Sequence, residues 1–150
     1  MSEKNDSNYI LSKEAAESEV KKILKYYELD IDDIEDKEQK KFIKANYDRL
    51  IKAARLGRLE VKIEKGISVI QHCRLIDEKG NSNALGETIT YKEINGEAKS
   101  ATAGKEATDL YGRIYAVMGS LSGVGEDGIK KLKGVDLSLC EVLGAIFLSA

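Results

Sequence analysis

The sequence contains no proline and no tryptophan, a single histidine, His72, and only two cysteines, Cys73 and Cys140. Two cysteines cannot form the disulfide framework of a small secreted domain, so we expect both to be free thiols in a cytoplasmic protein. One histidine argues against histidine-based catalysis and against a structural zinc site. The formal net charge of −2 leaves the chain without the overall positive field of a typical nucleic-acid-binding protein.

Long hydrophobic runs are also missing. The most apolar segment, 135–150, contains Asp136 and Glu141 and is shorter than the roughly 20 residues that span a bilayer. Residues 1–8 are polar and predict a disordered tail instead of a secretory signal. We therefore expect a cytoplasmic protein with no membrane segment.

Residues 9–57 predict a helical hairpin. Apolar residues recur at the spacing of one helical face in two segments, which an acidic connector, residues 28–38, separates. Asp36 is placed to cap the second helix, with Gln39 reaching back to it three residues later. Gly57 predicts a left-handed cap at the end of this helix.

An antiparallel β-meander is predicted next, because the apolar period changes from that of a helix to that of a strand. Apolar and charged residues alternate in 59–64, and 67–75 continues a second strand after a turn at Lys65-Gly66. A polar loop at 78–83 leads to a third strand at 87–94.

Asn95-Gly96 is the strongest short hairpin signal in the chain. We therefore expect residues 97–102 to return as a fourth strand beside the third.

The last third of the chain predicts helices again. An apolar face runs through 107–121, and a glycine-rich connector at 119–128 leads to a short helix near 129–132. The final helix, from about Asp136, is apolar on nearly all sides, so it is expected to be buried or bound to a partner.

These segments together predict the α+β class: an N-terminal helical hairpin, a small antiparallel meander and C-terminal helices. We expect the sheet and helices of 58–150 to form one compact domain with the hairpin of 9–57, since 150 residues suit a single core.

No motif of catalysis, cofactor binding or metal binding emerges from the sequence. Residues 123–128 match the letters of the dinucleotide-binding fingerprint, but they follow a predicted helix where a strand is needed, so we interpret them as a connector. The acidic connector 28–38 lacks the ligand spacing of a calcium loop. We expect no cofactor, no metal and no enzymatic activity; an enzyme would need a site assembled from scattered residues.

His72 and Cys73 are adjacent on a predicted strand, which directs their side chains to opposite faces. We therefore expect Cys73 in the core and His72 at the surface or an edge, instead of a shared metal site or a nucleophile–base pair.

Basic residues share one face of the second predicted helix, between 37 and 58: Lys37, Lys41, Lys44, Lys52 and Arg55, with Lys40 and Arg58 nearby. One interpretation is a phosphate-contacting helix in a nucleic-acid-associated accessory module. The alternative is the solvated back of an amphipathic helix, which we favour because no aromatic or amide cluster accompanies the charges to read bases. Nucleic acid is therefore not the partner we expect.

The C-terminal half carries a family resemblance. A strand hairpin ends in Ser100–Lys105 (SATAGK), a helix with Asp109, Leu110 and Tyr111 runs into Leu121-Ser122-Gly123, and Val135-Asp136-Leu137 opens the last helix after a short turn at 129–132. This succession, over about residues 59–148, resembles the tail assembly chaperones of long-tailed bacteriophages and related contractile systems. Those proteins commonly have a small sheet, a helix, a break of leucine, small residue and glycine, and a closing helix begun by aspartate.

The resemblance implies a non-enzymatic function. The family coats the helical tape-measure protein during tail assembly and prevents its aggregation until tube subunits replace it. The helical section 9–57 is more extended than expected in that family, so an elaborated member or a different phage or prophage protein stays open. Whether the chain forms a homo-oligomer also stays open.

An apolar last helix beside a glycine-jointed connector fits that function, because the two would form a groove for an amphipathic partner helix. The alternative for each apolar residue is a place in the core. The candidate partner contacts are Ile114, Met118, Leu121, Leu139, Leu143, Ile146 and Phe147.

Overall fold

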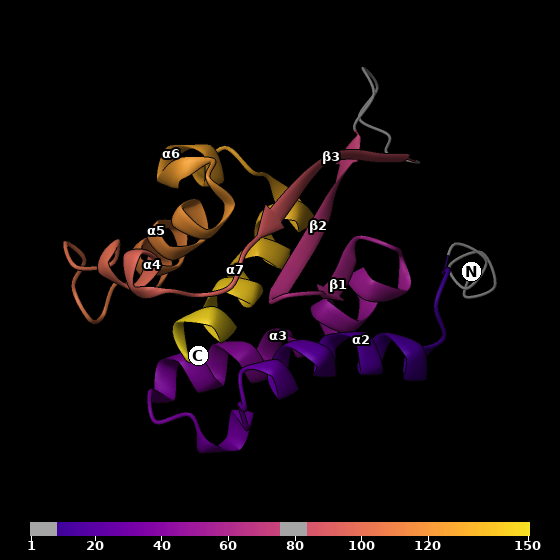
Figure 1. The fold of residues 1–150 in the computed structure, drawn as a ribbon, viewed down its shortest axis with the longest axis horizontal. Helices are drawn as coiled ribbons and strands as arrows, with labels where there is room; N and C mark the ends of the chain where they lie inside the picture. The colour runs from indigo at the N-terminus through magenta and orange to yellow at the C-terminus, as the bar shows by residue number, and fades with distance from the viewer. Residues whose placement is uncertain (1–8, 76–83) are drawn as a thin grey trace.

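The computed structural model describes residues 9–75 and 84–150. Helices occupy both ends of this part of the chain, and a three-stranded antiparallel sheet lies between them (Figure 1). The predicted α+β class is confirmed. The tail predicted at 1–8 and the loop predicted at 78–83 lie outside the described residues.

The N-terminal helical hairpin consists of α2 (Lys13–Tyr26) and α3 (Lys37–Arg55), which pack against each other. The acidic connector between them contains a short 3-10 helix, η1 (Ile31–Asp33). After α3, Gly57 adopts the left-handed conformation that was predicted for it, with φ of +76°.

Asp36 caps α3 as expected, since its carboxylate accepts hydrogen bonds from the amides of Glu38 and Gln39, both at 3.0 Å. The predicted return contact of Gln39 is wrong. Its side-chain amide instead donates to Ser149 Oγ at 3.0 Å, because Gln39 is buried against the end of the last helix.

The sheet has the order β1 (Leu59–Ile63), β2 (Ile67–Leu75), β3 (Ala84–Tyr91), and each strand runs antiparallel to its neighbour. Val61 pairs with Val69, which pairs with Tyr91, so that one buried side chain from each strand lies in a row across the sheet. The third strand was predicted at 87–94, so it begins and ends three residues earlier than expected.

The strand predicted at 97–102 is wrong, because the helix α4 (Gly96–Ser100) occupies most of this segment. The backbone of Asn95 has φ of −142°, not the positive value that an Asn-Gly hairpin turn needs. Its side chain caps α4 instead, accepting a hydrogen bond from the amide of Ala98 at 2.9 Å. Ala98 is fully buried, which anchors the short helix to the core.

The C-terminal helices are α5 (Leu110–Ser122), α6 (Gly125–Lys130) and α7 (Gly134–Leu148). They correspond to the predicted helices with shifted ends, and the short helix begins within the glycine-rich connector instead of after it. Gly123 and Gly125, with φ of +77° and +82°, turn the chain between α5 and α6.

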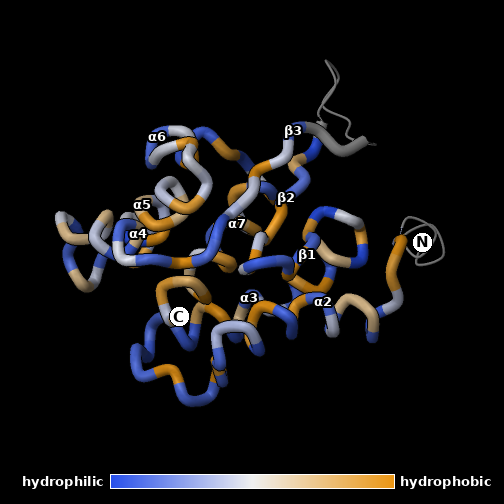
Figure 2. Tube along the Cα trace, viewed as in Figure 1, coloured by the Kyte–Doolittle hydropathy of each residue, from blue (hydrophilic) through white to orange (hydrophobic). Residues whose placement is uncertain are grey.

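The helix α7 passes behind the sheet and packs against α3, α5 and β2 (Figure 1). One hydrophobic cluster contains residues of the N-terminal hairpin, of the sheet and of α5 to α7, so 9–57 and 58–150 share a core. Figure 2 shows the contrast between apolar segments at the centre and the largely hydrophilic connector between α2 and α3. Within 9–75 and 84–150, no helix is both long enough and apolar enough to cross a bilayer.

Candidate functional site

The seven residues predicted to contact a partner all lie in the core. None exposes more than 4% of its surface, and the helices that carry them, α5 and α7, pack face to face. At this contact Gly144 of α7 leaves room for Ile114, whose Cγ2 lies only 2.6 Å from the position of a Cβ at residue 144. Ile114, Met118, Leu121, Leu139, Leu143, Ile146 and Phe147 therefore serve packing, the alternative that the sequence left open, and they form no exposed groove.

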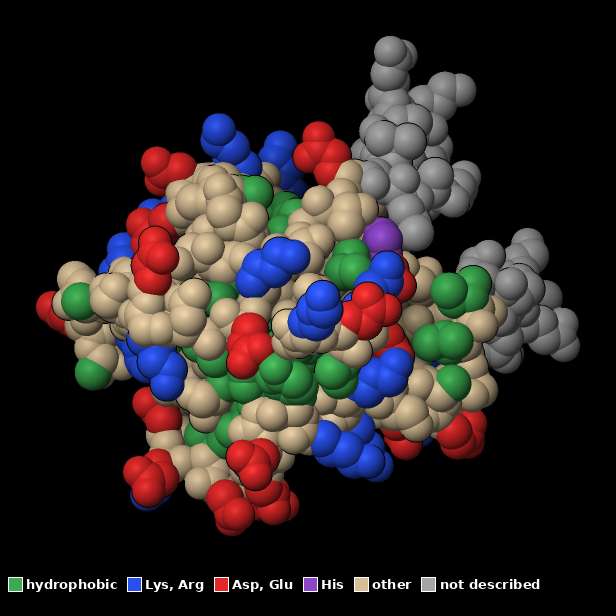
Figure 3. All heavy atoms as spheres, in the orientation of Figure 1, with side chains coloured by type: hydrophobic (Ala, Val, Ile, Leu, Met, Phe, Trp, Pro, Cys, Tyr) green, Lys and Arg blue, Asp and Glu red, His purple; other side chains and the backbone are tan. Residues whose placement is uncertain are grey.

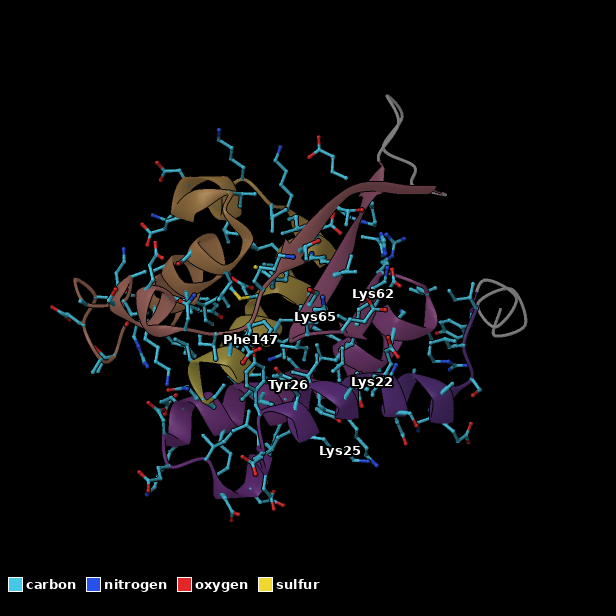
Figure 4. All side chains as sticks on the ribbon, viewed as in Figure 1. Lys22, Lys25, Tyr26, Lys62, Lys65 and Phe147 are labelled. Atoms are coloured by element: carbon cyan, nitrogen blue, oxygen red, sulfur yellow. The ribbon has the colours of Figure 1, made fainter. Side chains whose placement is uncertain are left out.

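Partly exposed apolar side chains form a different surface, between α2 and the end of α7. Figure 3 shows hydrophobic side chains gathered in a band at this place, and Figure 4 marks Tyr26, which belongs to it, and the buried Phe147, which lies beneath it. The ring of Tyr27 lies edge-on to Tyr26 at 5.4 Å and to Phe147 at 5.8 Å. We call Tyr26, Tyr27, Ile94 and Leu148, all partly exposed, the α2–α7 band.

Hydrogen bonds fix the band to the segment after β3. The Tyr27 hydroxyl accepts from the amide of Ile94 at 3.1 Å, and the Tyr26 hydroxyl donates to Glu93 at 2.6 Å. Burial raises the pKa of the Tyr27 hydroxyl, so this residue stays neutral.

A hollow of about 210 Å³ lies at the Phe147 end of the band. This volume is smaller than the usual range of about 300–1,000 Å³ for a small-molecule site, so the hollow suits one or two side chains. It is lined by Ile94, Lys99, Thr102, Arg113, Val117, Phe147 and Leu148.

Lysines surround the Tyr26 end of the band: Lys22 and Lys25 come from α2, and Lys62 and Lys65 from β1 and the turn after it (Figure 4). Lys22 pairs with Glu19 at 2.7 Å. Among the described residues, the other three lysines form no ion pair, although the carboxylate of Glu93 lies on the same face, where it accepts from Tyr26.

The predicted basic face of α3 divides into two parts. Near the start of the helix, Lys44 pairs with Asp32 of η1 at 2.5 Å, and Lys40 donates to the Asp32 carbonyl at 3.0 Å. The hydrogen bond from Lys44 lowers the pKa of the Asp32 carboxyl. Near the end of the helix, Arg55 lies 3.8 Å from the centre of the Tyr9 ring and donates to the Leu11 carbonyl, so it holds the chain before α2.

The remaining basic residues at the end of α3 line a cavity of about 270 Å³, which we call the basic cavity. It lies among α3, β2 and the first turn of α7, and Arg74 of β2 joins the cations of α3 there. Sequence reasoning missed Arg74, because no spacing rule connects a strand residue with a helix that precedes it. The lining residues are Arg49, Lys52, Ala53, Leu56, Arg58, Arg74, Val135, Asp136, Ser138 and Leu139.

A buried polar chain fixes the start of α7 beside this cavity. The two carboxylate oxygens of Asp136 accept from the amide of Arg74 at 3.2 and 3.3 Å, and the Asp136 carbonyl accepts from Gln71 Nε2 at 2.7 Å. Gln71 Oε1 in turn accepts from the Tyr91 hydroxyl at 2.7 Å. The aspartate that opens the last helix therefore joins α7 to the sheet.

The expected placement of His72 and Cys73 is confirmed. Cys73 is buried, while His72 is partly exposed and contacts Glu60 at 2.7 Å and Thr88 at 3.2 Å. Burial raises the pKa of Cys73 to about 11 and that of Cys140 to about 12, which keeps both thiols protonated. In the described part of the chain, no group of three or more His, Cys, Asp or Glu side chains is arranged to hold a metal ion.

Compared with profiles of protein families, with curated proteins and with solved structures, the chain matches none. Its function must therefore be inferred from its own residues. The two surfaces that stand out are the α2–α7 band and the basic cavity.

Proposed function

We propose that the protein is a non-enzymatic tail assembly protein of a phage or prophage, which binds a helical partner such as the tape-measure protein in the host cytoplasm. The observation that carries this proposal is the order of elements in residues 59–148. An antiparallel sheet precedes α5, the left-handed Gly123 breaks the chain, α6 follows, and α7 has Asp136 in its first turn. The family resemblance was drawn from this succession, except that α4 replaces the strand expected to end at 100–105.

The α2–α7 band is the surface that fits such a partner. Tyr26, Tyr27, Ile94 and Leu148 stay partly exposed although they pack against the core, and an amphipathic helix would cover them. The hollow beside Phe147 would take one apolar anchor of that helix, and well-packed anchors of this kind supply most of the binding energy in protein interfaces.

The N-terminal hairpin has a role in this arrangement. Tyr26 is the last residue of α2 and Tyr27 caps that helix, so the segment 9–57, which lies outside the family resemblance, forms one side of the band. Lys25, Lys62 and Lys65 favour a partner helix with acidic residues along the flank that faces them.

Co-expression tests the proposal. The full chain is produced together with the long coiled-coil protein encoded next to it, and the soluble fraction of that protein is measured with and without the chain. We expect a severalfold increase in the soluble fraction and co-purification of the two proteins. An unchanged soluble fraction, with no co-purification, would contradict the proposal.

Two matched variants locate the binding surface. Ile94→Glu places a charge in the band, and Val124→Glu makes a similar change at an apolar residue that is 47% exposed between α5 and α6. We expect Ile94→Glu to abolish the gain in solubility and Val124→Glu to keep it, with both variants retaining the circular dichroism of the folded chain. Equal behaviour of the two folded variants would place the partner elsewhere.

A further inference from the structure

The basic cavity carries more positive than negative charge among the described residues that line it. Four cationic side chains line it, Arg49, Lys52, Arg58 and Arg74, against the single carboxylate of Asp136. This charge is separate from the α2–α7 band, so its role does not depend on the partner proposed above.

Two donors in this cavity lack an acceptor. Arg58 Nη1 and Arg74 Nε are buried, and neither has a hydrogen-bond partner among the described residues. A buried donor without a partner is unfavourable, and more so when it belongs to a charged group. Burial and the neighbouring Arg74 charge also lower the pKa of the Arg58 guanidinium, although Asp136 opposes this effect.

Asp136 does not supply the missing acceptor. Both of its oxygens accept from the backbone amide of Arg74, and no ion pair within 9–75 and 84–150 joins this carboxylate to Arg58 or to the Arg74 side chain. Arg58 Nη1 and Arg74 Nε are therefore two buried donors that remain available for an added acceptor.

The first turn of α7 adds to the positive character of the cavity. No side chain caps this 15-residue helix, and its residues Val135 and Asp136 line the cavity. Gly134 has φ of +56°, and a Cβ there would lie 3.2 Å from Arg74 Nη2, so the guanidinium of Arg74 lies against the start of the helix. The amides of Asp136 and Leu137 already donate to the Lys133 carbonyl, so the donors that the cavity offers are the guanidinium groups, which bind phosphate well.

We propose that the basic cavity binds a phosphate group, either inorganic phosphate or the phosphate of a small monoester. Its oxygens would accept from Arg58 and Arg74 and offset the charge of Lys52. The volume of about 270 Å³ suits a small anion. A polynucleotide would need basic residues that continue along α3, but there Lys40 and Lys44 are already bound to Asp32.

Calorimetric titration and thermal unfolding of the full chain test this site. The probes are inorganic phosphate, glycerol 3-phosphate and a short single-stranded oligonucleotide, each at constant ionic strength. We expect saturable binding of inorganic phosphate or glycerol 3-phosphate and a matching rise in Tm. If inorganic phosphate binds more tightly, the ligand is the free anion; if glycerol 3-phosphate binds more tightly, it is a monoester. Either result supports the site.

Arg58→Met is the decisive variant. It removes a partly buried guanidinium whose Nη1 is buried without a partner, so we expect a higher Tm than wild type without phosphate and at least a tenfold loss of phosphate affinity. A purely structural role for Arg58 predicts a lower Tm instead. The matched control is Lys25→Met, an exposed lysine on α2, which should bind phosphate as wild type does.

Asp136→Asn tests the cavity a second time if Arg58→Met does not fold. It keeps an oxygen for the amide of Arg74 but removes the opposing charge, so phosphate affinity should rise severalfold. The proposal is overturned if neither phosphate probe changes the Tm of wild type, or if Lys25→Met loses the response as Arg58→Met does. Tighter binding of the oligonucleotide than of both phosphates would also overturn it.

Discussion

Gly119→Ala tests the close contact between α5 and α6. A Cβ at residue 119 would lie 2.5 Å from the amide nitrogen of Glu126 and 2.5 Å from the carbonyl carbon of Gly125. Both neighbours are backbone atoms, so a change of rotamer cannot make room, and α6 itself must shift. The substitution therefore measures how tightly the glycine-rich connector joins the two helices.

The expected magnitude follows from two opposing effects. Alanine stabilises a helix by about 1 kcal/mol relative to glycine. Overpacking costs about 1–3 kcal/mol, and the rigid backbone neighbours place this site at the upper end. We expect the free energy of unfolding to fall by about 2 kcal/mol, which corresponds to a decrease in Tm of about 4–8 °C for a chain of this size.

Urea unfolding of Gly119→Ala is compared with two controls that carry the same substitution. A Cβ at Gly104 meets nothing within 4 Å, so the free energy of unfolding of Gly104→Ala should equal that of wild type within about 0.5 kcal/mol. A Cβ at Gly144 would lie 2.6 Å from Cγ2 of the buried Ile114, a β-branched side chain that is stiff in a helix, so Gly144→Ala should also lose about 1–3 kcal/mol. If Gly119→Ala were as stable as Gly104→Ala, the close approach of α5 and α6 would be refuted.

Three further predictions concern buried and charged groups. Tyr91→Phe removes the donor to the buried Gln71 Oε1 and should lower the free energy of unfolding by about 1–3 kcal/mol in urea; an unchanged midpoint would contradict the hydrogen-bonded chain to α7. Because burial raises the pKa of Cys73 to about 11 and of Cys140 to about 12, a thiol reagent at about pH 8 should modify both only as the chain unfolds, and fast reaction in native protein would argue against their burial. The hydrogen bond from Lys105 at 2.8 Å lowers the pKa of the Glu126 carboxyl below its ordinary value of 4.5. The ionised carboxylate therefore stabilises the fold above pH 4.5, and this stabilisation is lost as the pH falls through the pKa that Glu126 has in the folded chain. Lys105→Met should therefore lose less stability on acidification, and a pH–stability curve parallel to that of wild type would contradict the pair.

Local signals predicted much of the fold. Asp36 and Gly57 mark the ends of α3, and the change of apolar period locates β1, because a cap or an alternating pattern depends on neighbouring residues alone. The prediction of a hairpin turn at Asn95 was wrong because it, too, depended on neighbouring residues alone. Asparagine favours both a tight turn and a helix N-cap, and only the burial of Ala98 decides that the cap forms.

The candidate surfaces were harder to predict, because they depend on which elements meet. Periodicity identified apolar faces on α5 and α7, but not that each covers the other, so Ile114 and Leu143 are core residues and not partner contacts. The basic cavity joins Arg58, just before β1, with Arg74 in β2, and the antiparallel pairing of these strands brings the two arginines together. Only the tertiary fold shows that α3 and the start of α7 complete the cavity around them.

The proposed binding of a helical protein partner through the α2–α7 band is tested most directly by calorimetric titration of the full chain with the purified long coiled-coil protein that is encoded next to it. Binding through the band predicts a saturable interaction with a negative heat-capacity change, because apolar surface is buried. It also predicts that Ile94→Glu weakens the affinity by about tenfold or more, while Val124→Glu leaves it unchanged. No detectable binding by wild type would contradict the proposed function, and equal affinities for the two folded variants would contradict binding through the band.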